Sequence, residues 1–496
     1  MKLWNRRLDH YPAPAARRAQ LALVVLITVA LYYALYVGGG VAPLAMRELH
    51  MSFGYLVGSL ALANAVGAFA SLLAGLSDRF GRANLVVYGL ALVAVLIAFA
   101  VPAVHSRLAY AALSVVIGFV EGIILVATPA LIRDFSPQVG RATAMGFWTV
   151  GPVLGSLLTS AVNSATLPSH PDWRSQFVYC GIFCLLVWVA AVFALRELTP
   201  GLRDQVMVSD RDRALVERRA LVSHADTPLL NPWRQVLRAD LLGSALGVSL
   251  LLLVYYTTVA FGVIYLSTVF GLSPARANGV LNWCWAANAL ALVAAGIWSD
   301  ALRVRKPFML AGGLGSMLLI FVFMGSAAGA GSHPSILALS AVGAAISMLM
   351  GGAYATWMAA FTEAIEARNP ALTATGLAVW GWLLRLVVTA AFLTLPYVVT
   401  TVTPLVQAGP LLEAAAHLRA TGATIPPDLA AGLDRVAAAA VATAGQWQGW
   451  YRLCGLGALA FVALVFAMRG RWSPARARAD QAAHDREVVL ELGGRA

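Results

Sequence analysis

The chain has 496 residues, of which 60% are hydrophobic and only 12% charged, and its mean hydropathy is +0.76. Soluble domains carry about 25% charged residues, so this composition excludes the soluble classes and predicts an all-α membrane protein. The formal net charge of +12 does not indicate nucleic-acid binding, because the basic residues gather at alternate ends of the apolar segments. We expect them to set the topology and to contact anionic lipid headgroups.

Twelve apolar segments are long enough to cross the hydrocarbon core as helices, since about 20 helical residues span it. In chain order the predicted spans are 20–44, 53–76, 84–103, 108–132, 143–164, 175–195, 240–269, 275–298, 307–329, 335–360, 371–399 and 448–468. With the amino terminus in the cytoplasm, most of the 35 Lys and Arg residues fall on the cytoplasmic side, which predicts that both termini are cytoplasmic. The strong preference for Arg over Lys, with abundant Ala, suggests a bacterial cytoplasmic membrane.

Six spans precede a polar stretch and six follow it. We therefore predict an N-terminal six-helix bundle at 1–195, a cytoplasmic linker at 196–239, a C-terminal six-helix bundle at 240–468 and a cytoplasmic tail at 469–496. The linker contains RDRALVERRALV, which suits a short helix on the bilayer surface. The external stretch 401–447 is long and rich in Ala, with Leu429, Leu433 and Val436 at helical spacing, and is expected to form a lid or a packed cap.

The two halves repeat two short motifs at nearly the same spacing. LYYALYVGGG (31–40) is matched by VYYTTVAFG (254–262), and AGLSDRFGR (74–82) by AGIWSDALRVRK (295–306). GLSDRFGRANL (75–85) resembles the loop signature of the major facilitator superfamily between its second and third helices. The resemblance implies two six-helix bundles around a central site that opens alternately to the two sides of the membrane.

The same loop predicts a cytoplasmic gate. Its residues, with those of the second copy, are Gly75, Asp78, Arg79, Gly81, Arg82, Asp300 and Arg303. Gly81 suits a turn with positive φ, and Asp78 at a helix end can face the positive end of another helix. Such a contact is weak enough to break during transport, and the resemblance implies helix 11 as its partner. A purely structural cap of the loop is the alternative.

GPVLGS (151–156), in the fifth span, resembles the GPxxG core of a signature associated with proton-driven exporters. Pro152 removes a backbone hydrogen bond, and Gly151 and Gly155 allow close helix approach, so bending and packing explain the motif without a role in substrate binding. The arginine that exporters commonly carry in the fourth helix is Gly118 here.

Two ionisable residues lie deep in the predicted spans, Glu121 in the fourth and Arg385 in the eleventh. An ionised side chain at the bilayer centre costs about 2.5 to 3.5 kcal/mol on insertion scales, so such residues usually face a cavity or a partner. A guanidinium keeps its charge and offers a fork of donors that matches a carboxylate, so Arg385 is assigned to an anionic substrate. A carboxyl group in apolar surroundings readily holds a proton, so Glu121 is assigned to proton coupling. The alternatives are that the two pair with each other or bind backbone carbonyls.

Aromatic side chains are expected around these charges, because the resemblance implies that helices 1, 4, 7 and 10 line the cavity. Tyr and Trp supply an apolar wall with a polar tip. The residues assigned to the substrate together with Arg385 are Tyr32, Tyr36, Tyr255, Tyr256, Tyr354, Trp357 and Asn288. Each aromatic would serve equally well in packing. Asn64, Asn282 and Asn288 would serve equally well as bridges between helices.

These features predict a secondary active transporter of a small organic anion, a carboxylate, coupled to protons and working by alternating access. It is expected to act as a monomer, with no cofactor, metal or nucleic-acid partner. WRSQF (173–177) resembles the opening of the sixth helix in many anion importers and favours import. The alternative is a proton-driven multidrug or metabolite exporter. The sequence contains no HExxH or GxSxG motif that would suggest an enzyme. The intact gate loop weighs against a receptor that has the same fold but does not transport.

Overall fold

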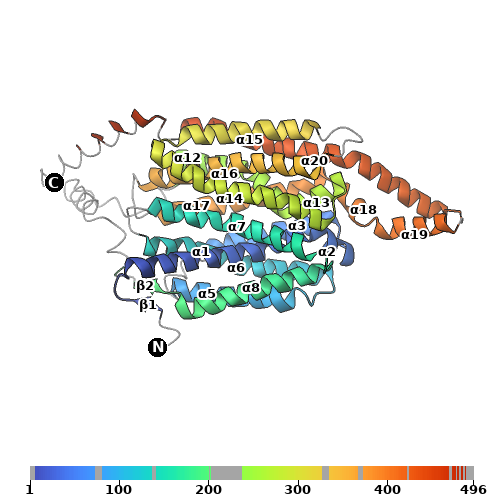
Figure 1. Cartoon of the computed structure of the whole chain (residues 1–496), viewed down its shortest axis with the longest axis horizontal. Coiled ribbons are helices and arrows are strands. Elements are labelled where there is room, and N and C mark those ends of the chain that lie inside the picture. Colours follow the sequence, from blue (N-terminus) through green and yellow to red (C-terminus); the bar gives the residue numbers. More distant parts are fainter. Residues whose placement is uncertain are drawn as a thin grey trace.

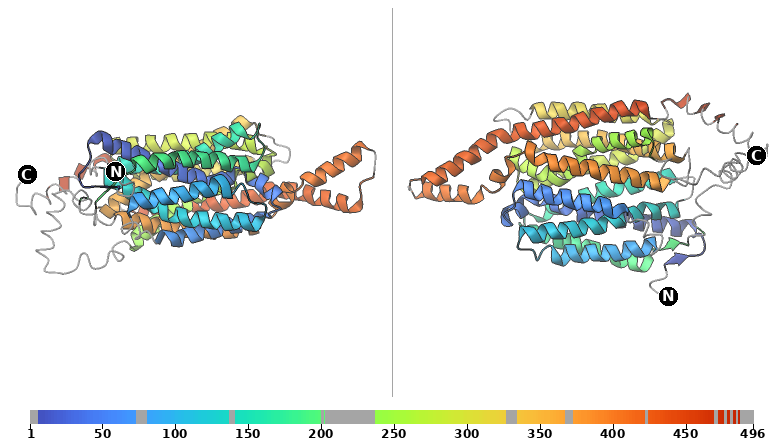
Figure 2. Two further views of the ribbon diagram at one scale, coloured as in Figure 1. Left: turned by 90° about the horizontal axis from the view of Figure 1, so that it is seen from below. Right: turned by 180° about the vertical axis from the view of Figure 1, so that it is seen from behind.

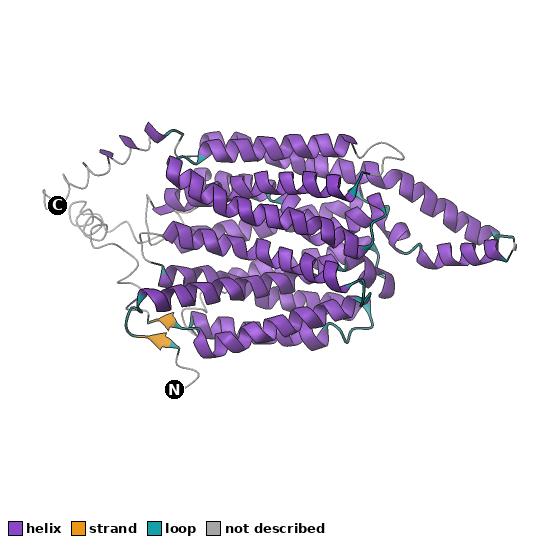
Figure 3. Ribbon diagram, viewed as in Figure 1, coloured by secondary structure: helices purple, strands orange, loops and turns teal. Residues whose placement is uncertain are grey.

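The structure is a computed structural model. It describes residues 6–72, 81–136, 141–199, 202, 237–326, 334–366, 373–421, 424–468, 472–475, 478–479, 482–483 and 486. Nearly all of these residues are helical (Figure 3). In hydrocarbon every backbone N–H and C=O needs a partner within the protein, and a helix supplies these partners from its own backbone. The predicted linker helix, at RDRALVERRALV, lies outside the described residues.

Six long helices form the N-terminal half. They are α1 (Pro14–Gly40), α3 (Phe53–Leu72), α5 (Arg82–Val95), α6 (Arg107–Phe135), α7 (Arg141–Thr166) and α8 (Trp173–Ala194). A short helix, α2 (Ala42–Glu48), follows α1, and a π-helical turn, η2 (Leu96–Ala100), continues α5.

The C-terminal half repeats this plan. Its helices are α12 (Ala239–Leu251), α13 (Leu253–Phe270), α14 (Pro274–Leu302), α15 (Lys306–Ser326), α16 (Ile336–Glu366), α17 (Thr373–Val398) and α20 (Pro427–Ala467). The seventh predicted span is thus two helices, α12 and α13, interrupted at Leu252. With that division, each predicted span has its helix and the all-α fold of two six-helix bundles is confirmed.

Eleven helical stretches in the described residues are long and apolar enough to cross a membrane, and α7 is not among them. Polar side chains such as Thr159, Ser160 and Asn163 lower its hydropathy, and all three are buried. They are buried because α7 packs between α1 of its own half and α14 of the other half. The second main contact between the halves joins α3 and α17.

The two ends of the bundle differ (Figures 1 and 2). At one end β1 (Arg7–Leu8) pairs in parallel with β2 (Glu197–Leu198), and we call this the β1–β2 end. From the opposite end, the α19 end, a helical hairpin projects that consists of α19 (Gly409–Ala420) and the first part of α20, joined to α17 through α18 (Val402–Val406). The stretch predicted as a lid or cap therefore contains helices.

Helix α20 is much longer than its predicted span. Its 41 residues rise about 60 Å, twice the roughly 30 Å of the hydrocarbon core. The buried Gly432 on α20 lies against Leu411 of α19, where an added Cβ would be 3.1 Å from Leu411 Cδ2. The hairpin is therefore held by its own packing as well as by its connection to the bundle.

Candidate functional site

A cavity of about 500 Å³ lies between the two halves. Its wall includes Tyr32 of α1, Asn64 of α3, Gly122 of α6, Pro152 of α7, Tyr255 and Tyr256 of α13, Asn288 of α14, Tyr354 of α16 and Arg385 of α17. It extends toward the β1–β2 end, where Ser71, Arg82 and Thr375 contribute to the wall. Leu252, at the interruption between α12 and α13, also lines it.

The Arg385 side chain is half-buried and lines this cavity. Its guanidinium lies against the backbone of α3, because a Cβ added to Gly67 would be 2.6 Å from Arg385 Nη1. Within the described residues no acceptor forms a hydrogen bond or ion pair with the guanidinium. The cation therefore faces the cavity with no hydrogen-bond or ion-pair partner among the described residues.

Gly67 is a site residue that the sequence analysis missed. The same added Cβ would also be 2.8 Å from the carbonyl oxygen of Gly118 on α6, and a Cβ at Gly122 would be 2.3 Å from the Gly67 oxygen. Glycines at 67, 118 and 122 thus let α3 and α6 approach closely, and Gly67 leaves room for the guanidinium. A GxxxG spacing at 118–122 was the available signal.

Replacing Gly67 with Ala is expected to weaken anion binding by about tenfold or more. The new methyl group must move either the guanidinium or α6, and overpacking of this kind costs about 1 to 3 kcal/mol. Gly58→Ala is the matched control on the same helix, since nothing lies within 4 Å of a Cβ added there. Equal affinities of the two variants for a carboxylate ligand, measured by calorimetry, would contradict this role of Gly67.

Glu121, on α6 beside Gly122, is only 1% exposed. Neither of its carboxyl oxygens has a hydrogen-bond partner among the described residues. The predicted alternative, in which Glu121 and Arg385 pair with each other, is therefore not seen in this conformation. Glu121 does not line the cavity, but Gly122, the next residue on α6, does.

Six of the eight residues assigned to the substrate line the cavity, namely Arg385, Tyr32, Tyr255, Tyr256, Tyr354 and Asn288. Tyr36 and Trp357 do not. Tyr36 packs in a ring cluster with Tyr32, centroids 5.5 Å apart, and with Tyr255, at 6.4 Å. Trp357 is fully buried behind Tyr354 and donates its indole N–H to Ser244 Oγ at 2.9 Å. Both support the wall rather than form it.

The three asparagines bridge helices. Asn64 donates to the Arg385 carbonyl oxygen at 2.8 Å, Asn282 to Ser164 Oγ at 2.9 Å, and Asn288 to the Ser347 carbonyl oxygen at 2.9 Å. The first two bonds join the two halves. Asn64 and Asn288 also reach the cavity wall.

The halves meet closely at the α19 end. A Cβ added to Gly39 of α1 would be 2.4 Å from the Val259 oxygen of α13, so the two backbones are in contact. Asn278 of α14, fully buried, donates to the Gly40 oxygen at 2.8 Å. The Phe53 and Phe261 rings pack with centroids 5.6 Å apart. The cavity is therefore closed toward the α19 end.

The sequence matches the model of the Major Facilitator Superfamily over residues 24–386, well over half of the chain. The chain belongs to the Major Facilitator Superfamily. The resemblance carried by the loop signature is thereby confirmed, and the protein is a membrane transporter.

Individual relatives are more distant. The MFS-type transporter oryF of Aspergillus oryzae (strain ATCC 42149 / RIB 40) is 30% identical over 178 residues, which are 34% of this chain and 35% of that protein. The chain therefore aligns with about a third of that relative's length.

Two solved structures share the fold. A bacterial homolog of the human lysosomal transporter Spinster, in an inward-facing and occupied conformation, has a TM-score of 0.63 and 18% identity, with 93% of this chain and 100% of that chain covered. A D-xylose-proton symporter has a TM-score of 0.58 and 18% identity, with 77% and 90% covered. At these identities the likeness concerns the fold alone.

The superfamily loop is described only in part. Gly75, Asp78 and Arg79 lie outside the described residues. Gly81 has a φ of +90°, as expected for the turn, and the Arg82 guanidinium pairs with buried Asp134 at 2.8 Å. This ion pair joins two residues of the N-terminal half.

The second copy of the superfamily loop forms its own ion cluster. Arg305 pairs with Asp300, at the end of α14, and with Glu363 of α16 at 2.9 Å. Burial alone would lower the pKa of the Arg305 guanidinium, but Glu363 and Asp300 raise it above its usual value. Arg303 adopts a left-handed conformation, with φ +56°, and ends α14. Among the described residues the Arg303 side chain forms no hydrogen bond or ion pair, so its part in the gate stays a prediction.

The GPxxG segment of α7 lies against α1. A Cβ added to Gly151 would be 2.7 Å from Thr28 Cγ2, and one added to Gly155 would be 2.6 Å from Tyr32 Cβ. Pro152 lines the cavity at the same level. Gly155 thus allows Tyr32 to approach α7 closely. Helix α1 is the element against which the glycines of this superfamily signature pack.

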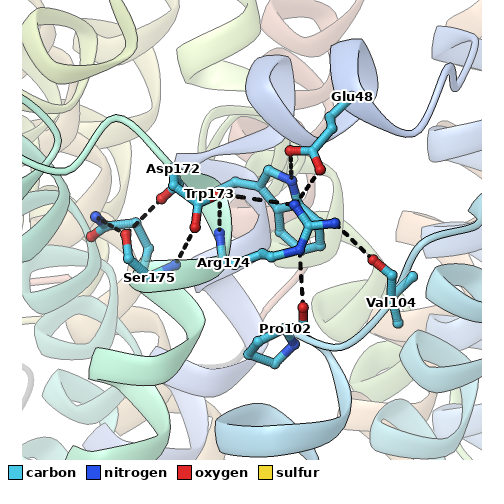
Figure 4. Close-up of polar contacts among 8 residues, drawn as sticks. Glu48, Pro102, Val104, Asp172, Trp173, Arg174 and Ser175 are labelled. Carbon is cyan, nitrogen blue, oxygen red and sulfur yellow. Dashed lines mark hydrogen bonds and ion pairs between the residues drawn. The ribbon is translucent and has the colours of Figure 1, made fainter.

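The Trp173–Arg174 pair lies at the α19 end, and neither residue lines the cavity. Figure 4 shows the polar contacts of the pair. Arg174 pairs with Glu48 of α2, and its guanidinium donates to the carbonyl oxygens of Pro102 and Val104, both at 2.9 Å. Trp173 donates its indole N–H to Glu48 Oε2 at 2.8 Å. The pair ties α8, α2 and the connection after η2 together within the N-terminal half.

Replacing Arg174 with Ala is expected to lower the melting temperature and to leave substrate affinity unchanged. Hydrogen bonds to charged groups contribute about 1.5 to 3 kcal/mol each, and this residue makes several. The control is Arg276→Ala, an exposed arginine at the same end of the molecule. A loss of substrate binding at unchanged stability would show that Arg174 takes part in transport directly.

Proposed function

We propose that the protein transports an organic anion, a carboxylate, together with protons across the bacterial cytoplasmic membrane. The carrying observation is the Arg385 guanidinium, which faces the cavity between the halves and has no acceptor among the described residues. A cation left unpaired at this depth is costly, and an anionic ligand would offset that cost with a bidentate pair.

Glu121 supports the coupling to protons. Its carboxyl group is buried without a partner in the described part of the chain, one residue from the cavity wall. The neutral carboxylic acid fits these surroundings better than a carboxylate does. Loss of its proton then requires either water or a charged partner, and Arg385 becomes such a partner once the substrate leaves.

The conformation fits the same cycle. If both termini are cytoplasmic, as the distribution of basic residues predicts, the β1–β2 end faces the cytoplasm. The contacts at Gly39, Asn278 and Phe53 then close the external side, and the cavity is in an inward-facing state. Transport requires these external contacts to open while the cytoplasmic ends of the halves approach each other.

The test is proton flux in proteoliposomes that contain a pH-sensitive dye. Carboxylates, organic cations and neutral sugars are added one at a time, with empty liposomes as the control. A proton flux that depends on carboxylates is the expected result. A flux that depends on organic cations, with none for carboxylates, would contradict the proposal and favour the drug exporter.

A further inference from the structure

Among the described residues, the cavity wall contains one cation that is not already paired. Its two basic residues are Arg385 and Arg82, and Arg82 forms an ion pair with Asp134 at 2.8 Å. Arg385 has no such partner in the described residues. The wall therefore balances a single negative charge, since a second carboxylate would be left without a counter-charge in an environment of low dielectric.

The asparagines of the wall donate hydrogen bonds to the protein itself. Asn64 donates to the Arg385 carbonyl oxygen at 2.8 Å and to Thr389 Oγ1 at 2.9 Å, which uses both hydrogens of its amide. Asn288 donates to the Ser347 carbonyl oxygen at 2.9 Å. Neither amide N–H group of Asn64 is free for the hydroxyl groups of a substrate.

Two further polar groups of the wall are engaged with protein partners. The Tyr255 hydroxyl shares a hydrogen bond with Ser156 Oγ at 3.2 Å. The Trp148 indole N–H donates to Thr128 Oγ1, also at 3.2 Å. A substrate with many hydroxyl groups would lose its hydrogen bonds to water here, and these engaged groups would not replace them.

The rest of the wall is apolar and aromatic. Its aliphatic members include Leu125, Val153, Leu252, Leu377 and Leu384. Trp380 lies five residues before Arg385 on α17 and also lines the cavity, and its ring packs against Tyr354 with centroids 6.1 Å apart. The indole N–H of Trp380 has no partner among the described residues. An aromatic surface thus lines the same cavity as the unpaired cation.

We infer that the substrate is an amphipathic monocarboxylate with an aromatic body. Its carboxylate binds the Arg385 guanidinium, and its ring packs against Trp380 and Tyr354. The inference rests on the proposed function and narrows its substrate class. It separates this protein from carriers of hydroxyl-rich substrates, whose sites need many free hydrogen-bonding groups.

The test is equilibrium binding to the full-length protein in lipid nanodiscs. The probes are three aromatic acids (cinnamate, indole-3-acetate and 4-phenylbutyrate), cinnamamide, which has the shape of cinnamate without its charge, and gluconate, which has the same charge and many hydroxyl groups. At least one aromatic acid is expected to bind tenfold or more tightly than gluconate, and cinnamamide is expected to bind more weakly than cinnamate by a similar factor.

Variants of the wall give a second readout. Trp380→Ala is expected to weaken binding of the aromatic acid at least tenfold, whereas Trp380→Phe keeps most of the affinity because the ring remains. Trp382→Ala, on the same helix but outside the cavity wall, is the matched control. If Trp380→Ala does not fold, Tyr354 gives the same test. Tyr354→Ala is then expected to lose affinity for the aromatic acid, and Tyr354→Phe to keep it.

The outcomes separate the inference from the proposed function. Binding of gluconate as tight as that of every aromatic acid, or no binding of the aromatic acids at all, overturns the aromatic body. A carboxylate-dependent proton flux would still support anion transport in that case. Equal binding of cinnamamide and cinnamate overturns the anion site itself, and with it both proposals.

Discussion

The Arg385→Gln variant is expected to bind carboxylate substrates at least about 30-fold more weakly than the unmodified protein. Truncating one partner of a buried, hydrogen-bonded charge pair costs about 2 to 5 kcal/mol, and about 1.4 kcal/mol corresponds to a factor of ten. The variant should fold normally, because within the described residues the guanidinium forms no hydrogen bond or ion pair that the mutation would remove. Calorimetric binding and thermal unfolding of both proteins check the two parts of the prediction.

Arg385→Lys tests the geometry of the same site. An ammonium group keeps the charge but cannot form the two parallel hydrogen bonds of a guanidinium with a carboxylate. Affinity is expected to fall between those of the unmodified protein and Arg385→Gln. Carboxylate binding by Arg385→Gln at unchanged affinity would remove Arg385 from the substrate site and make it a structural residue.

The Glu121→Gln variant is expected to lose accumulation driven by a pH gradient and to retain exchange of substrate across the membrane. Glutamine has the shape of a protonated glutamic acid but cannot release a proton. The variant therefore stays in the equivalent of the protonated state throughout the transport cycle. Uphill uptake in proteoliposomes should disappear. Counterflow with substrate on both sides should stay within about twofold of that of the unmodified protein.

Stability gives an independent check on Glu121. Its oxygens have no partner among the described residues, so the change to Gln removes no hydrogen bond and the melting temperature should not fall. Glu48→Gln is the control, because Glu48 pairs with Arg174 and accepts from Trp173 far from the cavity. That variant should lose stability and keep its coupling to protons. Uphill accumulation by Glu121→Gln would assign the coupling to another residue.

The sequence predicted the fold well because membrane helices follow from local composition. Apolar runs near 20 residues and the repeat of two motifs required no knowledge of packing. The interruption at Leu252 was missed because no Gly or Pro stands at that position. The length of α20 was missed because its first part is too polar for a span, and only its packing with α19 shows that it continues the same helix.

For the candidate site, the sequence indicated which residue types matter but not which way their side chains face. Arg385 and Glu121 stand out in any apolar run, since their burial needs an explanation. Whether an aromatic faces the cavity depends on the rotation of its helix about its axis, which the sequence does not state for Tyr36 or Trp357. The role of Gly67 could not be predicted for a similar reason. It depends on a contact between α3 and α17, two helices that lie far apart in the chain.

An experimental structure of the full-length protein with a carboxylate bound tests the role of Arg385 directly. We expect a bidentate pair, with both carboxylate oxygens about 2.7 to 2.9 Å from nitrogens of the Arg385 guanidinium, beside Trp380 and Tyr354. A carboxylate bound elsewhere in the cavity, with Arg385 paired to Glu121, would contradict this role.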